Sequence, residues 1–464
     1  MYFGQHIREY RDEILKFLAE MVAIPSVADG ASQLPDKPYG EAAAQALGHI
    51  LAKAKELGLS VKNVGNYAGH AAYDCGKEGY AAVLDHVDVV PAGTGWDTDP
   101  YVMTEQDGLL FGRGVLDNKG PAVVALFCLK ALQDYGVTGN RSIRCIFGSG
   151  EEIGMEDLTH YFKEEPLPDL SFTPDGNYGI CNREKGIIHM IFRGSNDSSL
   201  IRSFHAGEVC NAVPEVAEAV VACTAVEAET LSAAAKAAGE PCTVTFDEET
   251  GMAALTMQGK AAHAREPENG RNAAMHLLLL LARVFGKERL GSLPSFLVDA
   301  AGLETDGRRF GVEQSDSLSG PLTLNVGIVQ VDGTDWMAGI DIRYPVTADG
   351  DGIIRQIRER VEAAGFTYET LSHPRPLYAS EDSQLVTVLS NAYRTVMGEA
   401  PDLFSTGGGS YARCIPGRCV AFGPVFRVEP DRRIHQSGEH VDIELFFRHG
   451  EICLEAMYQM IMAE

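Results

Sequence analysis

A short apolar strand that ends in a histidine and an aspartate constrains this chain more than any other stretch. The run from Ala81 to Leu84 indicates a buried strand, and His86 and Asp88 follow it before a proline and glycine turn. Because side chains alternate along a strand, His86 and Asp88 point to the same side. Such a pair suits a metal-bound imidazole that a carboxylate orients. A hydrogen-bonded structural pair is the alternative.

Three further carboxylate positions follow the same plan. Asp117 lies in a glycine-rich loop that leads into the apolar helix AVVALFCLKAL. Glu151 and Glu152 end the apolar strand SIRCIFG, and Asp175 follows the short strand LSFT. Each has a plainer alternative, namely a helix cap for Asp117, a solvated helix N-terminus for the two glutamates and an Asp-Gly turn for Asp175.

The order of helices and strands predicts an α/β fold. Helical spacing of apolar residues over Ile7–Val22 and Gly40–Leu57 alternates with short strands, which is typical of an open mixed sheet flanked by helices. The polar residues at the strand ends are then expected at one edge of the sheet, where α/β proteins bind ligands. A histidine with several carboxylates there suits two divalent metal ions that share a bridging carboxylate.

Composition excludes several classes of function. The 464 residues exceed one ordinary core, so two or three domains are expected. A formal charge of −26 disfavours nucleic acid and anionic membranes as partners. The N-terminal stretch lacks the apolar segment of a signal peptide and no run is long enough to cross a bilayer, so we expect a cytoplasmic location. The ten cysteines contain no C-x-x-C pair and are expected to be free thiols.

A change of character marks a separate central segment. From about residue 184 to residue 376 strand-like runs such as IIHMIFRG and LTLNVGIVQVDG are separated by Ala-rich helices, which indicates α+β structure with antiparallel strands. This segment is large enough for one domain or for two α+β subdomains. We therefore predict a first domain built from residues 1–183 and 377–464, with residues 184–376 inserted into it.

The motifs HVD, GRGVLDNKG, SGEE and TPDG, in that order, resemble the M20 family of metallopeptidases, and more closely its PepV-like bacterial dipeptidases. The resemblance continues through GEVCNAVP, GKAAHAREPENGRNA, DIRYPV, STGGGSYAR and RRIHQSGEHV, so it covers nearly the whole chain. It implies a zinc-peptidase-like catalytic domain and identifies the central segment as a lid. In PepV-like enzymes the lid stands in for a dimer partner, which implies a monomer here, with a homodimer as the alternative.

The resemblance also implies a ligand set for two divalent metals, zinc first and manganese or cobalt as alternatives. One metal would be held by His86, Asp117 and Asp175, and the second by Asp117, Glu152 and His435, with Asp117 as the bridge. Asp88 would brace His86, Glu151 would be the general base, and the peptide bond after Asp117 would be cis. One departure is Asp85, which stands where the family usually has glycine and would face solvent or perturb the electrostatics of the site.

Residues of the lid and of a glycine loop would bind the substrate. By the resemblance, His263 stabilises the oxyanion with help from Asn211, and Arg343 grips the substrate carboxylate. Gly408, Gly409 and Ser410 would bring backbone amides close to the substrate. The residues alone leave a surface histidine, a structural ion pair and a plain turn as alternatives.

The expected function is metal-dependent hydrolysis of the peptide bond of dipeptides. In that mechanism a water activated by two metals loses its proton to Glu151, attacks the carbonyl carbon, and Glu151 returns the proton to the leaving amine. The expected partner is therefore a small peptide. An N-acyl amino acid deacylase of the same fold, and a non-catalytic protein that binds peptides or amino acids, are the alternatives.

Overall fold

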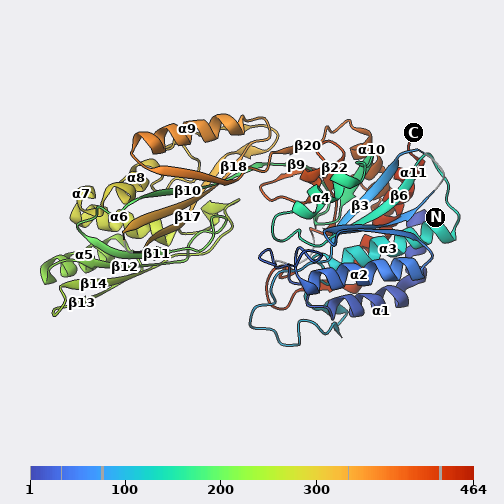
Figure 1. Ribbon diagram of the computed structural model, residues 1–464, viewed down its shortest axis with the longest axis horizontal. Helices are drawn as coiled ribbons and strands as arrows, with labels where there is room; N and C mark the ends of the chain where they lie inside the picture. Colours follow the sequence, from blue (N-terminus) through green and yellow to red (C-terminus); the bar gives the residue numbers. More distant parts are fainter. Residues whose placement is uncertain (1, 33, 75–77, 333, 428–430) are drawn as a thin grey trace. The chain divides into compact units, whose positions relative to one another are not determined.

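The computed structural model describes residues 2–32, 34–74, 78–332, 334–427 and 431–464. It divides into two compact units (Figure 1). Unit 1 comprises Met1–Arg183, Leu377–Ser405 and Gly409–Glu464, and unit 2 comprises Glu184–Pro376 and Thr406–Gly408. The short segment 406–408, which the sequence analysis left with the C-terminal part of the first domain, thus belongs to unit 2 by its contacts.

Unit 1 is built on a nine-stranded sheet in the order β1-β2-β6-β3-β7-β22-β9-β20, with β21 paired to β9. Strands β6, β3, β7 and β22 are parallel to one another, whereas β1, β2 and β9 pair antiparallel to their neighbours. The strands of this sheet are β1 (Ser60–Val64), β2 (Ala68–Tyr73), β3 (Tyr80–His86), β6 (Ser142–Gly148), β7 (Leu170–Thr173), β9 (Ile180–Glu184), β20 (Leu377–Tyr378), β21 (Leu403–Thr406) and β22 (Cys419–Ala421).

Helices cover both faces of this sheet. They are the 3₁₀ helices η1 (Phe3–Tyr10) and η3 (Tyr411–Cys414) and the α-helices α1 (Arg11–Val22), α2 (Glu41–Glu56), α3 (Lys119–Asp134), α4 (Glu156–Glu164), α10 (Gln384–Met397) and α11 (Ile443–Met462). Small ladders join β4 (Thr104–Gln106), β5 (Leu109–Phe111) and β24 (His440–Asp442), and β8 (Gly176–Asn177) with β23 (Pro424–Val425).

Alternation along β3 sends its side chains into two cores. Ala81 and Val83 pack in the larger core with α1, α2, α3, α10 and α11. Ala82 and Leu84 point the other way, into a smaller core with α4 and η3. Helix α3 is buried almost all round because it lies between β3 and the helices α1 and α11, which explains its continuously apolar sequence. The prediction of an open mixed sheet flanked by helices is confirmed.

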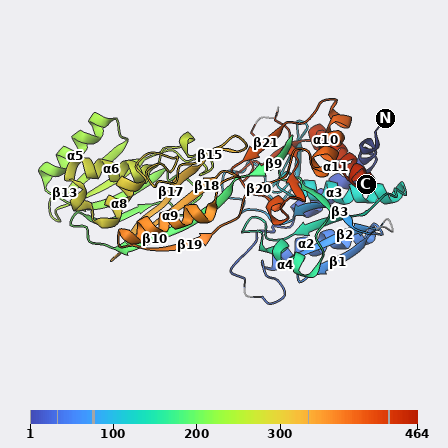
Figure 2. The ribbon, with the colours of Figure 1, turned by 90° about the horizontal axis from the view of Figure 1, so that it is seen from above.

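Unit 2 is an α+β structure on one antiparallel sheet, in the order β13-β14-β12-β11-β17-β18-β10-β19. One large core lies between this sheet and helices α5, α6, α8 and α9, which Figures 1 and 2 show alongside its strands. The strands are β10 (Gly186–Ser195), β11 (Ile201–Ala206), β12 (Val216–Ala222), β13 (Cys242–Asp247), β14 (Met252–Gln258), β17 (Thr323–Asp332), β18 (Asp335–Tyr344) and β19 (Thr367–Ser372).

The remaining elements of unit 2 are short or helical. They are α5 (Ala225–Ala238), η2 (Pro267–Asn269), α6 (Ala273–Phe285), α7 (Lys287–Leu290), α8 (Ser292–Ala300), α9 (Gly350–Ala363) and the β15 (Ser315–Asp316) and β16 (Gly320–Pro321) pair. The ends of α5 are set by its sequence. Thr224 and Glu227 form a reciprocal capping box at its start, and Gly239 ends the helix in the left-handed conformation.

The state of the cysteines and the search for a membrane-spanning helix bear on two further predictions. The nine cysteines in them are free thiols, as predicted, and Cys75 lies outside the described residues. Among the described helices, none combines the length and the apolar character that a membrane span requires.

A buried histidine makes the stability of unit 1 sensitive to acid. His449 on α11 is fully buried, its Nδ1 lies 2.9 Å from the Tyr178 hydroxyl, and burial lowers its pKa to about 3. An unfolded chain protonates this ring below about pH 6.5, so the unfolded state binds more protons over the window between these values. Stability from His449 is therefore present above pH 6.5 and is lost as the pH falls.

We expect wild-type protein to lose about 2 kcal/mol more unfolding free energy than His449→Gln between pH 7 and pH 5, at roughly 1.4 kcal/mol per pH unit below 6.5. Urea unfolding of both proteins at the two pH values measures the difference. His205→Gln is the control because the side chain of His205 is 57% exposed. Equal losses in wild type and His449→Gln would contradict the prediction.

Candidate functional site

The polar residues at the strand ends of unit 1 lie at one edge of its sheet. Strands β3, β6 and β7 run parallel, so their carboxyl ends meet at that edge. His86 is the last residue of β3, Glu151 follows β6 and Asp175 follows β7. The parallel pairing therefore brings together residues that are far apart in the sequence.

Asp88 orients His86 and also holds the turn that carries the two glutamates. Nδ1 of His86 lies 3.0 Å from the carbonyl oxygen of Asp88 and 3.4 Å from its Oδ1. The backbone N–H groups of Glu151 and Glu152 donate to Oδ1 and Oδ2 of Asp88, at 3.3 Å and 3.1 Å. With Nδ1 donating to the carbonyl oxygen, Nε2 of His86 presents its lone pair to the site, which is the tautomer that a metal ligand requires.

Asp117 offers one carboxylate oxygen to each of two imidazoles. Its Oδ1 lies 3.1 Å from Nε2 of His86, and its Oδ2 lies 3.0 Å from Nε2 of His435. The same nitrogen of His435 lies 3.3 Å from Oε1 of Glu152. The cis peptide bond between Asp117 and Asn118 is confirmed, and Asn118 rather than Asp117 is the residue that precedes α3. Asp117 is thus placed as a bridging carboxylate would be.

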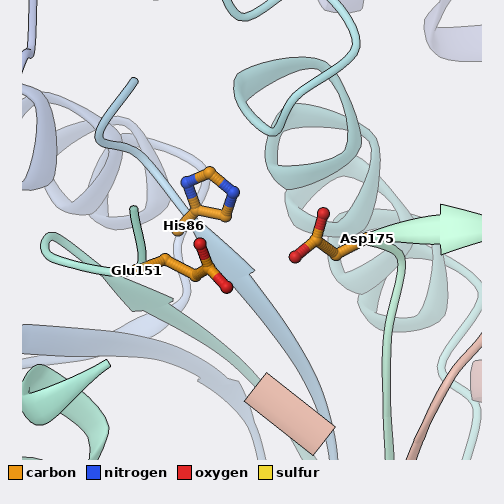
Figure 3. A group of neighbouring side chains, drawn as sticks. All are labelled: His86, Glu151 and Asp175. Carbon is orange, nitrogen blue, oxygen red and sulfur yellow. The ribbon is translucent and has the colours of Figure 1, made fainter. Parts of the chain in front are cut away.

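The side chains of Glu151 and Asp175 point toward the same space as the ring of His86, as Figure 3 shows. Ligand atoms of His86, Glu151 and Asp175 all lie within 4.8 Å of one another, and the same holds for His86, Asp117 and Glu152. Glu151 is only 8% exposed, so it does not sit at a solvated helix end. It occupies a ligand-like position beside His86, in addition to standing next to Glu152 in the sequence.

The electrostatics of these residues show an excess of negative charge. Burial, followed by the charge of Asp175, raises the pKa of Glu151 well above its ordinary value, and burial with the charge of Asp117 raises that of Asp175 to about 7. Hydrogen bonds to Asp117 and Glu152 raise the pKa of His435 to about 11. Carboxylates crowded in this way around imidazoles fit divalent cations.

In unit 2 the segments of Asn211 and His263 lie side by side. The residue after Asn211, Ala212, forms a β-bridge with His263, and the N–H of Ala264 donates to the carbonyl oxygen of Asn211 at 2.9 Å. Nδ1 of His263 accepts the N–H of Arg265 at 3.0 Å. The neutral ring therefore carries its proton on Nε2, the tautomer in which the exposed His263 acts as a donor.

Arg343 is held in a buried ion pair. Its Nε and Nη2 donate to Oδ1 and Oδ2 of Asp341 at 2.7 Å and 2.6 Å, and Nη1 donates to the carbonyl oxygen of Gly407 at 2.8 Å. The side chain of Arg343 is 4% exposed. These contacts use three of the five N–H groups of a guanidinium. The structural ion pair is thus present, and the binding of a substrate carboxylate by Arg343 stays a prediction.

The glycine loop is divided between the units. Gly408 belongs to unit 2, and its N–H donates to Oγ1 of Thr406 at 3.0 Å. Gly409 and Ser410 belong to unit 1, where the buried Ser410 accepts the N–H of Ala412 at 3.3 Å and begins η3. The three residues therefore do not all fall within one unit.

Residues 82–462 match the sequence profile of Peptidase family M20/M25/M40. The chain belongs to this family. This M20 peptidase is 34% identical, across 97% of both chains, to the Bacillus subtilis (strain 168) protein named "Putative dipeptidase YtjP". It is 30% identical, across 99% of both chains, to the Staphylococcus saprophyticus protein named "Putative dipeptidase SSP1012". The predicted family, and with it a hydrolase that acts on peptide bonds, is confirmed.

Solved structures share the fold of this M20 peptidase. Human carnosine dipeptidase 1 aligns with a TM-score of 0.62 at 17% identity, covering 99% of this chain and 98% of that one. The dipeptidase Dug1p from Saccharomyces cerevisiae aligns with a TM-score of 0.60 at 15% identity, covering 100% and 98%. At these identities the likeness concerns the fold.

Three buried residues of the M20 peptidase support the site without having been predicted to do so, namely Glu439, Asp157 and Tyr411. The carboxylate of Glu439 accepts the N–H groups of Gly114, Leu116 and Asp117. Asp157 accepts the N–H of Gly150 at 2.9 Å and the hydroxyl of Tyr411. Glu439 stands in a short loop motif and Asp157 in the first turn of α4, so neither position carries a sequence signal for these long-range bonds.

Asp85, next to His86, does not face solvent. It is 0% exposed, and neither carboxylate oxygen has a hydrogen-bond partner among the described residues. It points into the larger core, on the same side of β3 as Val83. Burial raises its pKa well above the ordinary value for an aspartate. The chain therefore pays a desolvation cost at this position without a visible compensating bond.

We expect Asp85→Ala to raise the unfolding free energy by about 1–3 kcal/mol, the mutational cost of an unpaired buried polar group. Thermal unfolding in chelator-stripped protein measures the change without a contribution from bound metal. The matched control is Asp97→Ala, because Asp97 is exposed on a loop. A lower melting temperature in Asp85→Ala would contradict the prediction and show that Asp85 is stabilised in the native state.

Proposed function

We propose that the protein is a metal-dependent dipeptidase that uses two divalent ions, with zinc as the first candidate and manganese or cobalt as alternatives. The family is that of a peptidase, and the two relatives described above carry dipeptidase in their names. The observation that carries the proposal is the placement of Asp117, whose two oxygens face Nε2 of His86 and Nε2 of His435.

The proposed ligand sets are those that the family resemblance implies, and the contacts of Asp117 and His435 support them. His86, Asp117 and Asp175 would hold one ion, and Asp117, Glu152 and His435 would hold the other. When bound, the two ions supply Lewis-acid chemistry that lowers the pKa of the attacking water and polarises the scissile carbonyl. The excess of negative charge among these side chains is what two dications would neutralise.

Glu151 is proposed as the general base and acid. Asp88 fixes its backbone, and burial with neighbouring carboxylates favours a carboxyl that can hold a proton. Glu151 takes a proton from the attacking water, the water oxygen bonds to the carbonyl carbon, and Glu151 gives the proton to the nitrogen as the C–N bond breaks. The products are a carboxylic acid and an amine, which become a carboxylate and an ammonium by proton transfer, so both hydrogens of the water are accounted for.

Unit 2 is proposed to act as the substrate-binding lid. His263, with its proton on Nε2, would donate to the carbonyl oxygen as negative charge develops, assisted by Asn211. Arg343, oriented by Asp341, would bind the C-terminal carboxylate of the peptide. Gly408, Gly409 and Ser410 would contribute the loop beside the substrate.

A competition assay tests the proposed function. Chelator-stripped protein is reloaded with zinc or manganese and given a mixture of dipeptides, tripeptides and N-acetyl amino acids, and mass spectrometry follows the loss of each substrate. We expect selective loss of dipeptides that is absent in the chelated control. Selective loss of the N-acetyl amino acids would overturn the dipeptidase and identify a deacylase. Loss of no substrate by the metal-loaded protein would favour a binding protein.

A cytoplasmic location, a monomeric state and the absence of nucleic-acid and membrane partners are proposed together with this function. The formal charge of −26 supports the last of these.

A further inference from the structure

A fully buried ion pair joins the loops that carry the proposed metal ligands. Arg113 is 1% exposed and Glu439 is 0% exposed, and Nη1 of Arg113 donates to Oε2 of Glu439 at 2.7 Å. Neither residue is a proposed metal ligand, and the proposed mechanism does not use them. A buried pair of this kind is costly to desolvate unless further hydrogen bonds satisfy both groups.

Glu439 holds the backbone of the Asp117 loop. Its Oε1 accepts the N–H groups of Gly114, Leu116 and Asp117 at 3.0, 3.1 and 3.1 Å, and the carbonyl oxygen of Glu439 accepts the N–H of Gly112 at 3.1 Å. One carboxylate therefore fixes the loop directly before the bridging aspartate, through charge-assisted bonds that are stronger than neutral ones.

Arg113 reaches the other two loops. Its Nη2 lies 3.3 Å and 3.4 Å from the carbonyl oxygens of Pro91 and Ala92, in the loop that follows His86 and Asp88. The same nitrogen lies 3.2 Å from the carbonyl oxygen of Gln436, the residue after His435. The pair thus connects the segments of His86, Asp117 and His435 by hydrogen bonds to backbone groups alone.

We propose that Arg113 and Glu439 are positioning residues that set the separation of the three metal-bearing loops, so that Asp117 can face His86 and His435 at the same time. The proposal rests on the proposed metal centre. Residues around the ligands of a metal commonly change its affinity or the activity by about 10- to 100-fold when they are replaced. The effect is expected at both sites, because each has two of its three proposed ligands on loops that the pair joins.

The test uses full-length Glu439→Gln and Arg113→Lys with two readouts that do not need turnover. In chelator-stripped protein we expect segment 112–118 to exchange its amide hydrogens about 10-fold faster in Glu439→Gln, because the charged acceptor is lost. In titration calorimetry with Mn²⁺ we expect both binding events to lose about 10- to 100-fold in affinity in both variants. The double variant should lose about as much as one single variant, because the two residues act as one unit.

Glu165→Gln is the matched control. Glu165 also pairs with a partly buried arginine in the same unit, because Nη1 of Arg144 lies 2.6 Å from its Oε2. Glu165 has no role in the proposed site. Exchange at 112–118 and Mn²⁺ affinity should be unchanged in this variant even where its melting temperature falls. Unchanged exchange and affinity in Glu439→Gln would overturn the inference. If Glu439→Gln does not fold, wild-type affinity in Arg113→Lys overturns it instead.

The outcome is distinguishable from a failure of the proposed function. A wild-type protein that binds two ions and hydrolyses no dipeptide would overturn the dipeptidase but leave exchange and affinity as valid tests of the pair. A wild-type protein that binds no Mn²⁺ or Zn²⁺ would overturn both.

Discussion

Replacing Glu151 with alanine is expected to lower kcat for dipeptide hydrolysis by about 10²- to 10⁴-fold, the range that one general acid–base group contributes. The side chain lies next to His86 and Asp175, and Asp88 holds its backbone, so the carboxyl is fixed where a proton could be taken up and returned. The backbone bonds of Asp88 do not depend on this side chain, so the turn should keep its structure. Steady-state kinetics at saturating metal measure the change.

The metal affinity of Glu151→Ala distinguishes two causes of a lower kcat. Because Glu151 also occupies a ligand-like position, its removal could act by releasing an ion instead of by removing a base. We expect Glu151→Ala to bind Mn²⁺ within a few-fold of wild type by titration calorimetry, which would assign the loss to proton transfer. Glu156→Ala is the control, because Glu156 is exposed on the same stretch of chain. Wild-type kcat in Glu151→Ala would remove the residue from its role, and a lost ion would make it a ligand.

The strand ends made most of the site predictable. His86, Glu151 and Asp175 each stand at or shortly after the end of a buried strand, and parallel strands bring such ends together whatever their separation in the sequence. The two cores on either side of β3 follow from simple alternation. In these cases the local sequence carries the information, because the strand period determines which way each side chain points.

The supporting contacts could not be predicted in the same way. The bonds between Glu439 and the Asp117 loop join residues more than 300 positions apart, and no local pattern distinguishes such a carboxylate from a solvated one. Asp85 was expected to face solvent or to perturb the electrostatics of the site; the first expectation is wrong because the residue is buried, and the second stays a prediction. The partner of Arg343 did carry a signal, since Asp341 stands two residues earlier on β18 and alternation places both side chains on one face.

The second large effect is expected at Asp117, because each of its oxygens faces a different imidazole. Asp117→Ala should lower metal content at both positions, whereas His435→Ala should lower it at one. Loss of Lewis-acid stabilisation worth several kcal/mol corresponds to at least about 10³-fold in kcat/KM. Metal content by mass spectrometry after desalting, together with kcat/KM, measures both effects.

The comparison of these two variants is what tests the bridge. If Asp117 serves only one ion, Asp117→Ala and His435→Ala will retain the same metal content, and the bridging role will be wrong. The exposed Asp97→Ala controls for the loss of one negative charge from the chain. Retention of two ions by Asp117→Ala would place the metals on other residues. Loss of both ions from this variant alone would make Asp117 the residue on which the whole centre depends, since no other carboxylate contacts both His86 and His435 among the described ion pairs.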